Sequence, residues 1–204
     1  MMKIAIKFLR LTLVLAIFAS AIFGSWFNLF VAACTLGLTF LPAWLESKYR
    51  LVLPLDFEFA IVFFIYASLF LGETHNFYDH FWWWDVLLHV GSAIAFGFIG
   101  FLILFILFKA DKVNANPFWI AVFSFCFAVS VGAIWEVFEF SMDQLFGFNM
   151  QKSGLVDTMW DIIIDSGGAL VASVAGYAYM KGSHQSYLAK LVRLFIKSNP
   201  NIVK

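Results

Sequence analysis

Charged residues are scarce in this sequence of 204 residues: only 13% are Asp, Glu, Lys or Arg, whereas 63% are hydrophobic. A soluble domain of this size carries roughly a quarter charged and half apolar residues. The shortage of charge excludes an ordinary soluble fold and indicates a protein surrounded by membrane lipid. Basic and acidic residues are equal in number, 13 of each, so no nucleic-acid partner is expected.

Cysteine is also rare, and the familiar catalytic motifs are missing. Cys34 and Cys126 both lie in apolar runs, and we interpret them as buried thiols that say little about the redox compartment. The sequence contains no glycine-rich phosphate loop, no H-E-x-x-H and no Glu-x-x-His pair of the di-iron bundle type. No nucleophile elbow frames a serine. Any enzymatic chemistry would therefore be metal-assisted or acid–base.

Long runs without charge predict the membrane helices. A spanning helix needs about 20 mainly apolar residues, and the uncharged run 11–45 is too long for one span. It suits two short spans with a turn at Gly24-Ser25, and a polar connection with Pro54 follows at 46–57. We predict an all-α integral membrane protein whose six-helix domain covers residues 1–182, before a tail at 183–204. The predicted spans are about 9–24, 27–45, 58–73, 84–108, 118–142 and 158–180.

The first apolar run has two interpretations. MMKIAIKFLR followed by LTLVLAIFASAIFGS resembles a signal peptide with Ala19-Ser20-Ala21 as a cleavage-like site. The alternative is a first membrane helix that stays attached. We favour the second, because the apolar run continues to Leu45 without a charge.

The basic residues predict the orientation. With the N-terminus inside, every Lys and Arg except Lys152 falls on the inner side of the six spans, which is a strong positive-inside bias. We therefore expect both termini in the cytoplasm and the protein in the bacterial inner membrane. Tryptophans, among them Trp82, Trp83 and Trp84, fall near the predicted ends of spans, as in an aromatic belt. The tail segment 186–197, SYLAKLVRLFIK, predicts an amphipathic helix on the inner membrane surface.

Acids and histidines gather on the predicted outer side instead. Asp85 and His89 share one helix face, with His89 about 6 Å deeper. A charge near the bilayer centre costs roughly 2.5–3.5 kcal/mol, so facing carboxylates must be protonated, hydrogen-bonded or bound to a cation. The residues predicted on this side are Glu73, Asp79, Asp85, Glu136, Glu139, Asp143, Asp157, Asp161 and Asp165, with His75, His80 and His89.

These residue types predict a divalent metal site. One or more histidines among carboxylates suit Zn, Mn or Fe, and Mg remains possible for carboxylates alone. The predicted metal ligands are Asp85, His89, Glu139 and Asp161, and the predicted catalytic acid–base residues are Glu136 and Asp165.

Structural roles compete with this prediction at several positions. For Asp157 we favour an N-cap or first-turn acid over a ligand, and for Asp85 both roles stay open. Asp79, His75 and His80 suit solvated loop positions. The small residues of Gly168-x-x-x-Ala172-x-x-x-Gly176 predict close approach of a neighbouring helix.

Three segments, in this order, resemble the YjdF-like family of bacterial inner membrane proteins: LGETHNFYDHFWWWDVLLH (71–89), WEVFEFSMDQLFG (135–147) and DTMWDIIIDSGGA (157–169). The resemblance covers about 55–181, the last four predicted spans. The family is of unknown function, so the resemblance implies a helical membrane fold and no activity. The positions that it marks are Glu73, Asp85, His89, Glu136, Glu139, Asp157, Asp161 and Asp165.

Three function classes remain open at this point. The leading hypothesis is a metal-dependent membrane enzyme that acts on a lipid or cell-envelope substrate at the outer side. The first alternative is a proton- or cation-coupled transporter, because acids inside membranes often line ion routes. The second is a structural membrane subunit, in an oligomer or with a membrane partner, whose acids pair only with polar groups.

Overall fold

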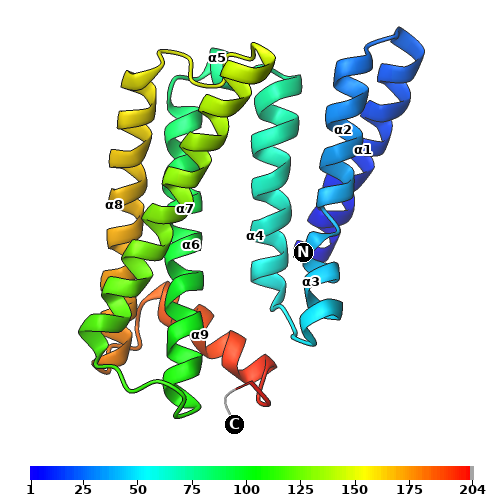
Figure 1. Cartoon of the computed structure of the whole chain (residues 1–204). Coiled ribbons are helices and arrows are strands. Elements are labelled where there is room, and N and C mark those ends of the chain that lie inside the picture. Colours follow the sequence, from blue (N-terminus) through cyan, green and yellow to red (C-terminus); the bar gives the residue numbers. More distant parts are fainter. Residues whose placement is uncertain (203–204) are drawn as a thin grey trace. The chain divides into compact units, whose positions relative to one another are not determined.

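The computed structural model describes residues 1–202, and this part of the chain is helical without any strand. Six helices in it are long and apolar enough to cross a membrane, which confirms the predicted all-α membrane fold. Contacts divide the chain into two compact units, Met1–Asp85 and Val86–Lys204 (Figure 1). The candidate spans are Met2–Phe23, Trp26–Tyr49, Leu55–Thr74, Trp83–Lys109, Pro117–Phe146 and Leu155–Met180.

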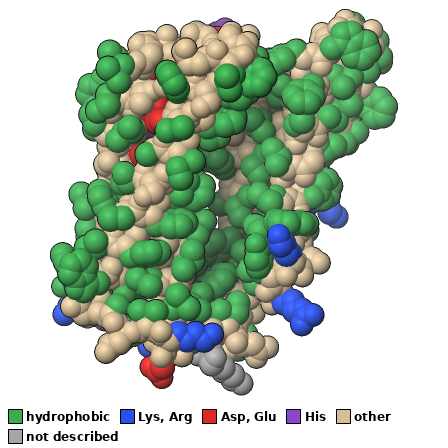
Figure 2. Space-filling view, in the orientation of Figure 1, with side chains coloured by type: hydrophobic (Ala, Val, Ile, Leu, Met, Phe, Trp, Pro, Cys, Tyr) green, Lys and Arg blue, Asp and Glu red, His purple; other side chains and the backbone are tan. Residues whose placement is uncertain are grey.

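Large apolar side chains are exposed along these helices. Phe8 is 62% exposed, Ile134 69% and Leu145 75%, and hydrophobic side chains cover most of the face seen in Figure 2. So much exposed apolar surface is unfavourable in water and suits contact with lipid. Cys34 and Cys126 are free and exposed as well. The prediction of buried thiols was therefore wrong, because an apolar run in a spanning helix has an outward face too.

In the first unit, α1 (Met2–Phe23) and α2 (Trp26–Leu38) form a hairpin. The predicted turn is confirmed: Gly24 ends α1 with φ of 71°, a left-handed conformation that glycine adopts without steric cost. Leu13 of α1 is fully buried and packs with Tyr66 and Phe70 from later in the unit.

The second span is interrupted between α2 and α3 (Leu41–Tyr49), whose first turn contains Pro42. Arg10 of α1 covers the break: its Nε donates to Thr39 Oγ1 at 3.1 Å and its Nη2 to the Thr39 carbonyl at 2.7 Å. Its guanidinium also lies 4.3 Å from the centre of the Phe40 ring. A cation at the carbonyl end of a helix is stabilising, which gives Arg10 a structural role.

The connection predicted at 46–57 is shorter than expected. Helix α3 continues to Tyr49 and α4 (Leu55–Ile65) begins directly after Pro54, so only a few residues are irregular. Glu46 stabilises this turn, because its Oε1 accepts a hydrogen bond from the Leu53 backbone N–H at 2.7 Å. The polar residues of the predicted connection therefore belong mainly to the end of α3 and to the turn that Glu46 stabilises.

Helix α4 continues into a π-helix, η1 (Tyr66–Thr74), which the short helix α5 (Phe77–His80) follows. His75 lies after η1 with its Nδ1 3.1 Å from the Phe70 carbonyl oxygen. Trp84 is only 8% exposed, and its ring lies 4.9 Å from that of Phe77. Trp84 is therefore packed inside the first unit and is not part of an aromatic belt.

The second unit is built on α6 (Trp83–Lys109), α7 (Pro117–Phe146) and α8 (Leu155–Met180). Helices α6 and α8 run in the same direction and meet along a seam of small residues, which confirms the predicted close approach. A Cβ added to Gly168 would lie 2.8 Å from Ala93 Cβ, and one added to Gly97 would lie 2.7 Å from Ala172 Cβ. The facing pairs are Gly168 with Ala93, Ala172 with Gly97, and Gly176 with Phe101.

Helix α7 crosses α8 obliquely (Figure 1). It is tied to α6 by Ser124, whose hydroxyl donates to the Gly97 carbonyl at 2.6 Å. After α7, Asp143 holds the following loop: its two carboxylate oxygens accept from the backbone N–H groups of Met150 and Gln151 at 2.7 and 2.9 Å. Asp143, one of the predicted outer acids, therefore has a structural role.

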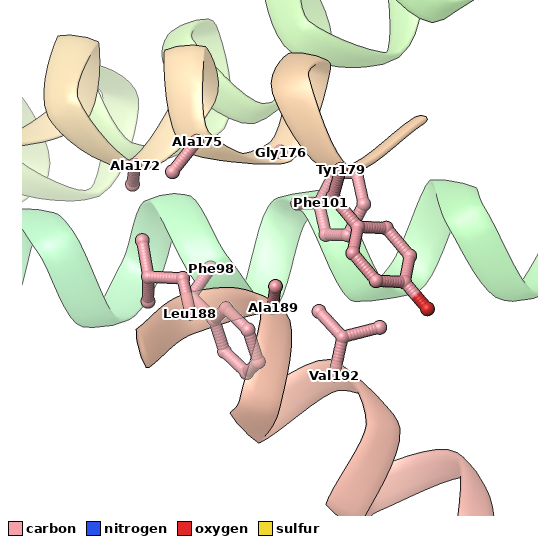
Figure 3. A pocket seen from close by; sticks show the side chains of 9 residues that line it. All are labelled: Phe98, Phe101, Ala172, Ala175, Gly176, Tyr179, Leu188, Ala189 and Val192. Atoms are coloured by element: carbon pink, nitrogen blue, oxygen red, sulfur yellow. The ribbon is translucent and has the colours of Figure 1, made fainter. Parts of the chain in front are cut away.

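Helix α9 (Tyr187–Ser198) forms in the predicted amphipathic tail, with Ser186 as its N-cap. Ala189, Val192 and Phe195 of its apolar face are buried. Figure 3 shows Leu188, Ala189 and Val192 facing side chains of α6 and α8. The apolar face thus packs on protein, while Lys204 of the predicted tail lies outside the described residues.

Candidate metal centre

His89 of α6 lies between two aspartates of α8. Asp161 and Asp165 are one helical turn apart and so project from the same face. The distance from His89 Nδ1 to Asp165 Oδ1 is 3.2 Å, and from His89 Nε2 to Asp161 Oδ1 it is 3.9 Å. His89 is only 7% exposed, Asp161 4% and Asp165 3%. One imidazole therefore bridges two buried carboxylates.

The contact with Asp165 decides which ring nitrogen of His89 carries the proton. An ionised carboxylate can only accept a hydrogen bond, so the proton of this bond belongs to His89 Nδ1. A neutral imidazole then has its lone pair on Nε2, the atom that faces Asp161. A carboxylate that accepts from one nitrogen of a histidine is the usual arrangement behind a metal-binding histidine.

Asp85 lies one turn before His89 on the same helix. The boundary between the two compact units falls directly after Asp85, but α6 runs through it without interruption. Ligand atoms of Asp85, His89 and Asp161 all lie within 4.8 Å of one another, and Asp85 is the only one of the three that is partly exposed. Asp85 is also in the first turn of α6, so both roles predicted for it are compatible with its position.

Helix α7 adds Glu136 to this cluster. Glu136 is 3% exposed, and neither of its carboxylate oxygens has a hydrogen-bond partner of bonding geometry in the described part of the chain. The groups that act on its charge are the Thr158 hydroxyl, His89, Asp165 and Asp157. A carboxylate buried without a partner costs several kcal/mol. Its two oxygens therefore point to a proton, water or cation as the missing partner.

Gly132, which sequence reasoning missed, makes room for this arrangement. It lies one turn before Glu136 on α7, and a Cβ at this position would collide with the carboxylate of Asp165. Only glycine therefore leaves the space that Asp165 occupies beside His89. The available signal was the spacing Gly132-x-x-x-Glu136, which places the glycine on the helix face of the buried acid.

Two other predicted acids are not part of the group of ligand atoms found around His89 among residues 1–202. Glu139 is partly exposed, and its Oε1 accepts a hydrogen bond from the exposed Trp135 Nε1 at 2.8 Å. It is absent from the group of ligand atoms found among residues 1–202. Asp157 lies in the first turn of α8, as the interpretation as a first-turn acid expected. The residues brought together are Asp85, His89, Glu136, Asp161 and Asp165.

The sequence supplies almost no basic residue to balance these acids. Residues 51–108 contain no Lys or Arg, and residues 113–180 contain only Lys152, which is in the loop between α7 and α8. His89 is the one basic side chain within the cluster. The remaining positive charge that buried carboxylates require must come from protons or from a bound cation.

Comparison with known proteins places the chain in a family. The family model described as "Predicted membrane protein (DUF2238)" matches residues 5–182. A protein of Thermotoga maritima, described as an uncharacterized protein, is 31% identical over 107 residues, which are 50% of this chain and 51% of that protein. The chain thus spans about half the length of the curated relative that it matches. No solved structure matches. The YjdF-like resemblance is confirmed, and the chain belongs to the DUF2238 family of predicted membrane proteins.

Proposed function

We propose that this membrane protein binds one divalent metal ion through His89 Nε2 and the carboxylates of Asp85 and Asp161. The observation that carries the proposal is the His89–Asp165 contact of 3.2 Å, because it leaves Nε2 with its lone pair beside Asp161. Asp165 would hold the imidazole in this orientation, as carboxylates do behind metal-binding histidines.

The spacing of the ligand atoms supports an ion of ordinary size. Nitrogen and oxygen ligands lie about 2.0–2.2 Å from Zn²⁺, so ligands on opposite sides of the ion are about 4 Å apart. The ligand atoms of Asp85, His89 and Asp161 lie within 4.8 Å of one another. Small rotations of the side chains are therefore enough to close the site around an ion.

The ligand set selects among metals. An imidazole nitrogen combined with carboxylate oxygens suits Zn²⁺, Mn²⁺ or Fe²⁺, whereas Mg²⁺ prefers oxygen ligands and retains its waters. We therefore expect a transition metal or zinc, with Mg²⁺ as a weaker competitor. The three proposed protein ligands leave coordination positions for water or substrate.

Glu136 supports a catalytic use of such an ion. A bound divalent metal ion turns water into a nucleophile near neutral pH. Glu136 offers a buried carboxylate that lacks a hydrogen-bond partner among the described residues and lies within electrostatic reach of His89. It is therefore the group that would accept the proton of that water. In this proposal Glu136 is the acid–base residue, and Asp165 acts by positioning His89.

The charge of the site favours an uncharged substrate. Sites that transfer phosphoryl groups clamp the phosphate with Arg, Lys or metal ions. Here Asp85, Glu136, Asp161 and Asp165 already exceed the charge of one divalent ion, and no Lys or Arg lies on α7 or α8. An ester or amide carbonyl of a membrane lipid or envelope compound fits better than a phosphate. The positive-inside distribution would place this end of the helices outside a bacterial inner membrane, with both termini in the cytoplasm.

Metal content tests the proposal. The full chain should be purified in detergent without chelator and analysed for metals, beside His89→Ala and Asp161→Ala and with Glu139→Gln as the matched control. We expect nearly one metal ion per chain in the wild type and in Glu139→Gln, and its loss in the two site variants. Size-exclusion chromatography confirms that the variants stay folded.

Absence of metal under every supplementation would contradict the proposal. The buried acids would then be protonated or paired internally. A proton- or cation-coupled transporter and a structural subunit would be the remaining candidates. Cation or proton flux in proteoliposomes separates them, because only a transporter produces flux that Glu136→Gln abolishes.

A further inference from the structure

The two faces of α9 have different surroundings: the apolar face is buried and the basic face is exposed. Ala189, Val192 and Phe195 recur at helical spacing and are buried. Ala189 and Val192, together with Leu188, lie against Phe98 and Phe101 of α6 and against Ala172 and Tyr179 of α8 (Figure 3). An amphipathic helix that binds membranes in the usual way buries its apolar face among acyl chains. In α9 this face is already occupied by protein, so any attraction to the membrane must come from the other face.

The other face of α9 is cationic. Lys190, Arg193 and Lys197 recur at intervals of three and four residues, so they share a side of the helix, and all three are exposed. No Asp or Glu occurs anywhere in 181–204. Within residues 1–202, none of the three forms an ion pair with a carboxylate; Arg193 Nη1 donates to the His184 carbonyl at 2.8 Å. These charges are therefore not neutralised by the protein.

The position of α9 selects the partner. It follows α8 after a short turn and packs on the last turns of that helix and on α6. In a bilayer that α6 and α8 cross, the end of these helices that α9 covers would face the phospholipid headgroups. Lys109, Lys112 and Lys181 belong to the same end of these helices, and Figure 2 shows Lys and Arg side chains at the lower edge, where α9 lies in Figure 1.

We propose that Lys190, Arg193 and Lys197 of α9 form a docking surface for anionic phospholipid headgroups. The partner is the membrane in which the protein is embedded and not a soluble acidic macromolecule, because the surface lies beside lipid-exposed helices. The interaction is electrostatic, so it weakens with salt. It is independent of the metal site and holds whether or not that site binds an ion.

The test uses the full chain in a nonionic detergent. Phosphatidylglycerol or phosphatidylcholine is added as mixed micelles, and the thermal unfolding midpoint is followed as a function of lipid concentration. The variant K190Q/R193Q/K197Q removes the surface without touching the buried face. The matched control is K3Q/K7Q, which removes exposed charges of α1.

We expect phosphatidylglycerol, and not phosphatidylcholine, to raise the midpoint of the wild type and of K3Q/K7Q. In the triple variant the phosphatidylglycerol needed for half of the effect should rise on the order of 100-fold, since each basic residue contributes about a factor of five. Raising NaCl from about 0.1 to 1 M should reduce the wild-type effect, because the Debye length falls from about 10 to 3 Å.

Three results would overturn the proposal. An equal response to phosphatidylcholine would show that charge is not what is recognised. An undiminished response of the triple variant would place the lipid site elsewhere. An equal midpoint increase with heparin in place of lipid would show a general polyanion surface and not a headgroup site.

Discussion

The carboxylate of Asp165 on α8 lies over Gly132 of α7, in the space that a Cβ at position 132 would fill. Asp165 in turn accepts the hydrogen bond that orients His89 on α6. The backbone of a third helix therefore limits where the imidazole can point. The site depends on α7 even though none of its three proposed metal ligands comes from that helix.

Gly132→Ala should weaken metal binding about 10- to 100-fold, the usual effect of losing a partner behind a metal ligand. The added methyl group displaces the Asp165 carboxylate, and the strain lowers the free energy of unfolding by about 1–3 kcal/mol. Competition titration and chemical unfolding in detergent measure the two effects. Gly91→Ala is the matched control, because a Cβ on Gly91 of α6 meets nothing within 4 Å. Equal metal affinity in Gly132→Ala and the wild type would contradict the positioning role of Asp165.

Asp165→Asn should lower metal affinity less than His89→Ala does. The amide keeps the shape of the side chain but no longer provides a charged acceptor for Nδ1–H, so the tautomer with its lone pair on Nε2 is less favoured. We expect a loss of about 10- to 100-fold for Asp165→Asn and no measurable binding for His89→Ala. The measurement is a Co²⁺ titration followed by visible absorption. If Asp165→Asn removed the metal completely, Asp165 would be a direct ligand.

Glu136→Met should make the metal-free protein more stable. Replacing a buried carboxylate without a partner by an apolar side chain of similar volume removes its desolvation cost, which corresponds to a gain of about 1–3 kcal/mol. The same variant should lose any metal-dependent hydrolysis. Unfolding in detergent with chelator measures the gain, and Glu139→Met, which removes the bond from Trp135, is the control expected to show none. A destabilised Glu136→Met would mean that its carboxylate has a stabilising partner.

Gly168→Ala should destabilise the second unit, whereas Gly167→Ala should not. A methyl group on Gly168 would lie 2.8 Å from Ala93 Cβ and 3.0 Å from the Val90 carbonyl oxygen, whereas one on Gly167 meets nothing within 4 Å. The two substitutions have the same intrinsic helix propensity change, so their difference reports the packing alone. We expect about 1–3 kcal/mol between them in unfolding experiments. Equal stability would show that α6 and α8 are not in contact at this point.

The long helices were predictable because a spanning helix is marked by composition alone. Each candidate span overlaps a predicted segment. The irregularities inside the spans were harder to predict from the sequence. The π-helix Tyr66–Thr74 differs from an α-helix only in the pairing of its backbone groups, which no apolar pattern records. The interruption before Pro42 had a signal in the proline, but its stabilisation by Arg10 depends on contact with another helix.

The candidate site was predictable where spacing on one helix decides the matter. Asp85 and His89 share a face, as do Asp161 and Asp165, and these residues lie together. Spacing could not choose between Glu136 and Glu139, because they are three residues apart and either can turn toward a neighbour. Tertiary packing decides it: Glu136 is buried within electrostatic reach of His89, whereas Glu139 accepts a hydrogen bond from Trp135. Gly132 was missed for the same reason, since its role exists only against Asp165 on another helix.

The seam between α6 and α8 also sets the alignment of the candidate site. His89 and Phe101 are both on helix α6. A Cβ on Gly176 of helix α8 would lie 2.5 Å from the Phe101 ring, so the ring occupies the space that the missing side chain of Gly176 leaves. A shift of one helix along the other by a single residue, about 1.5 Å, would make this ring collide with the neighbouring side chain. It would also move the His89 imidazole away from Asp165. The metal affinity of the site would then report the position of α6 along α8.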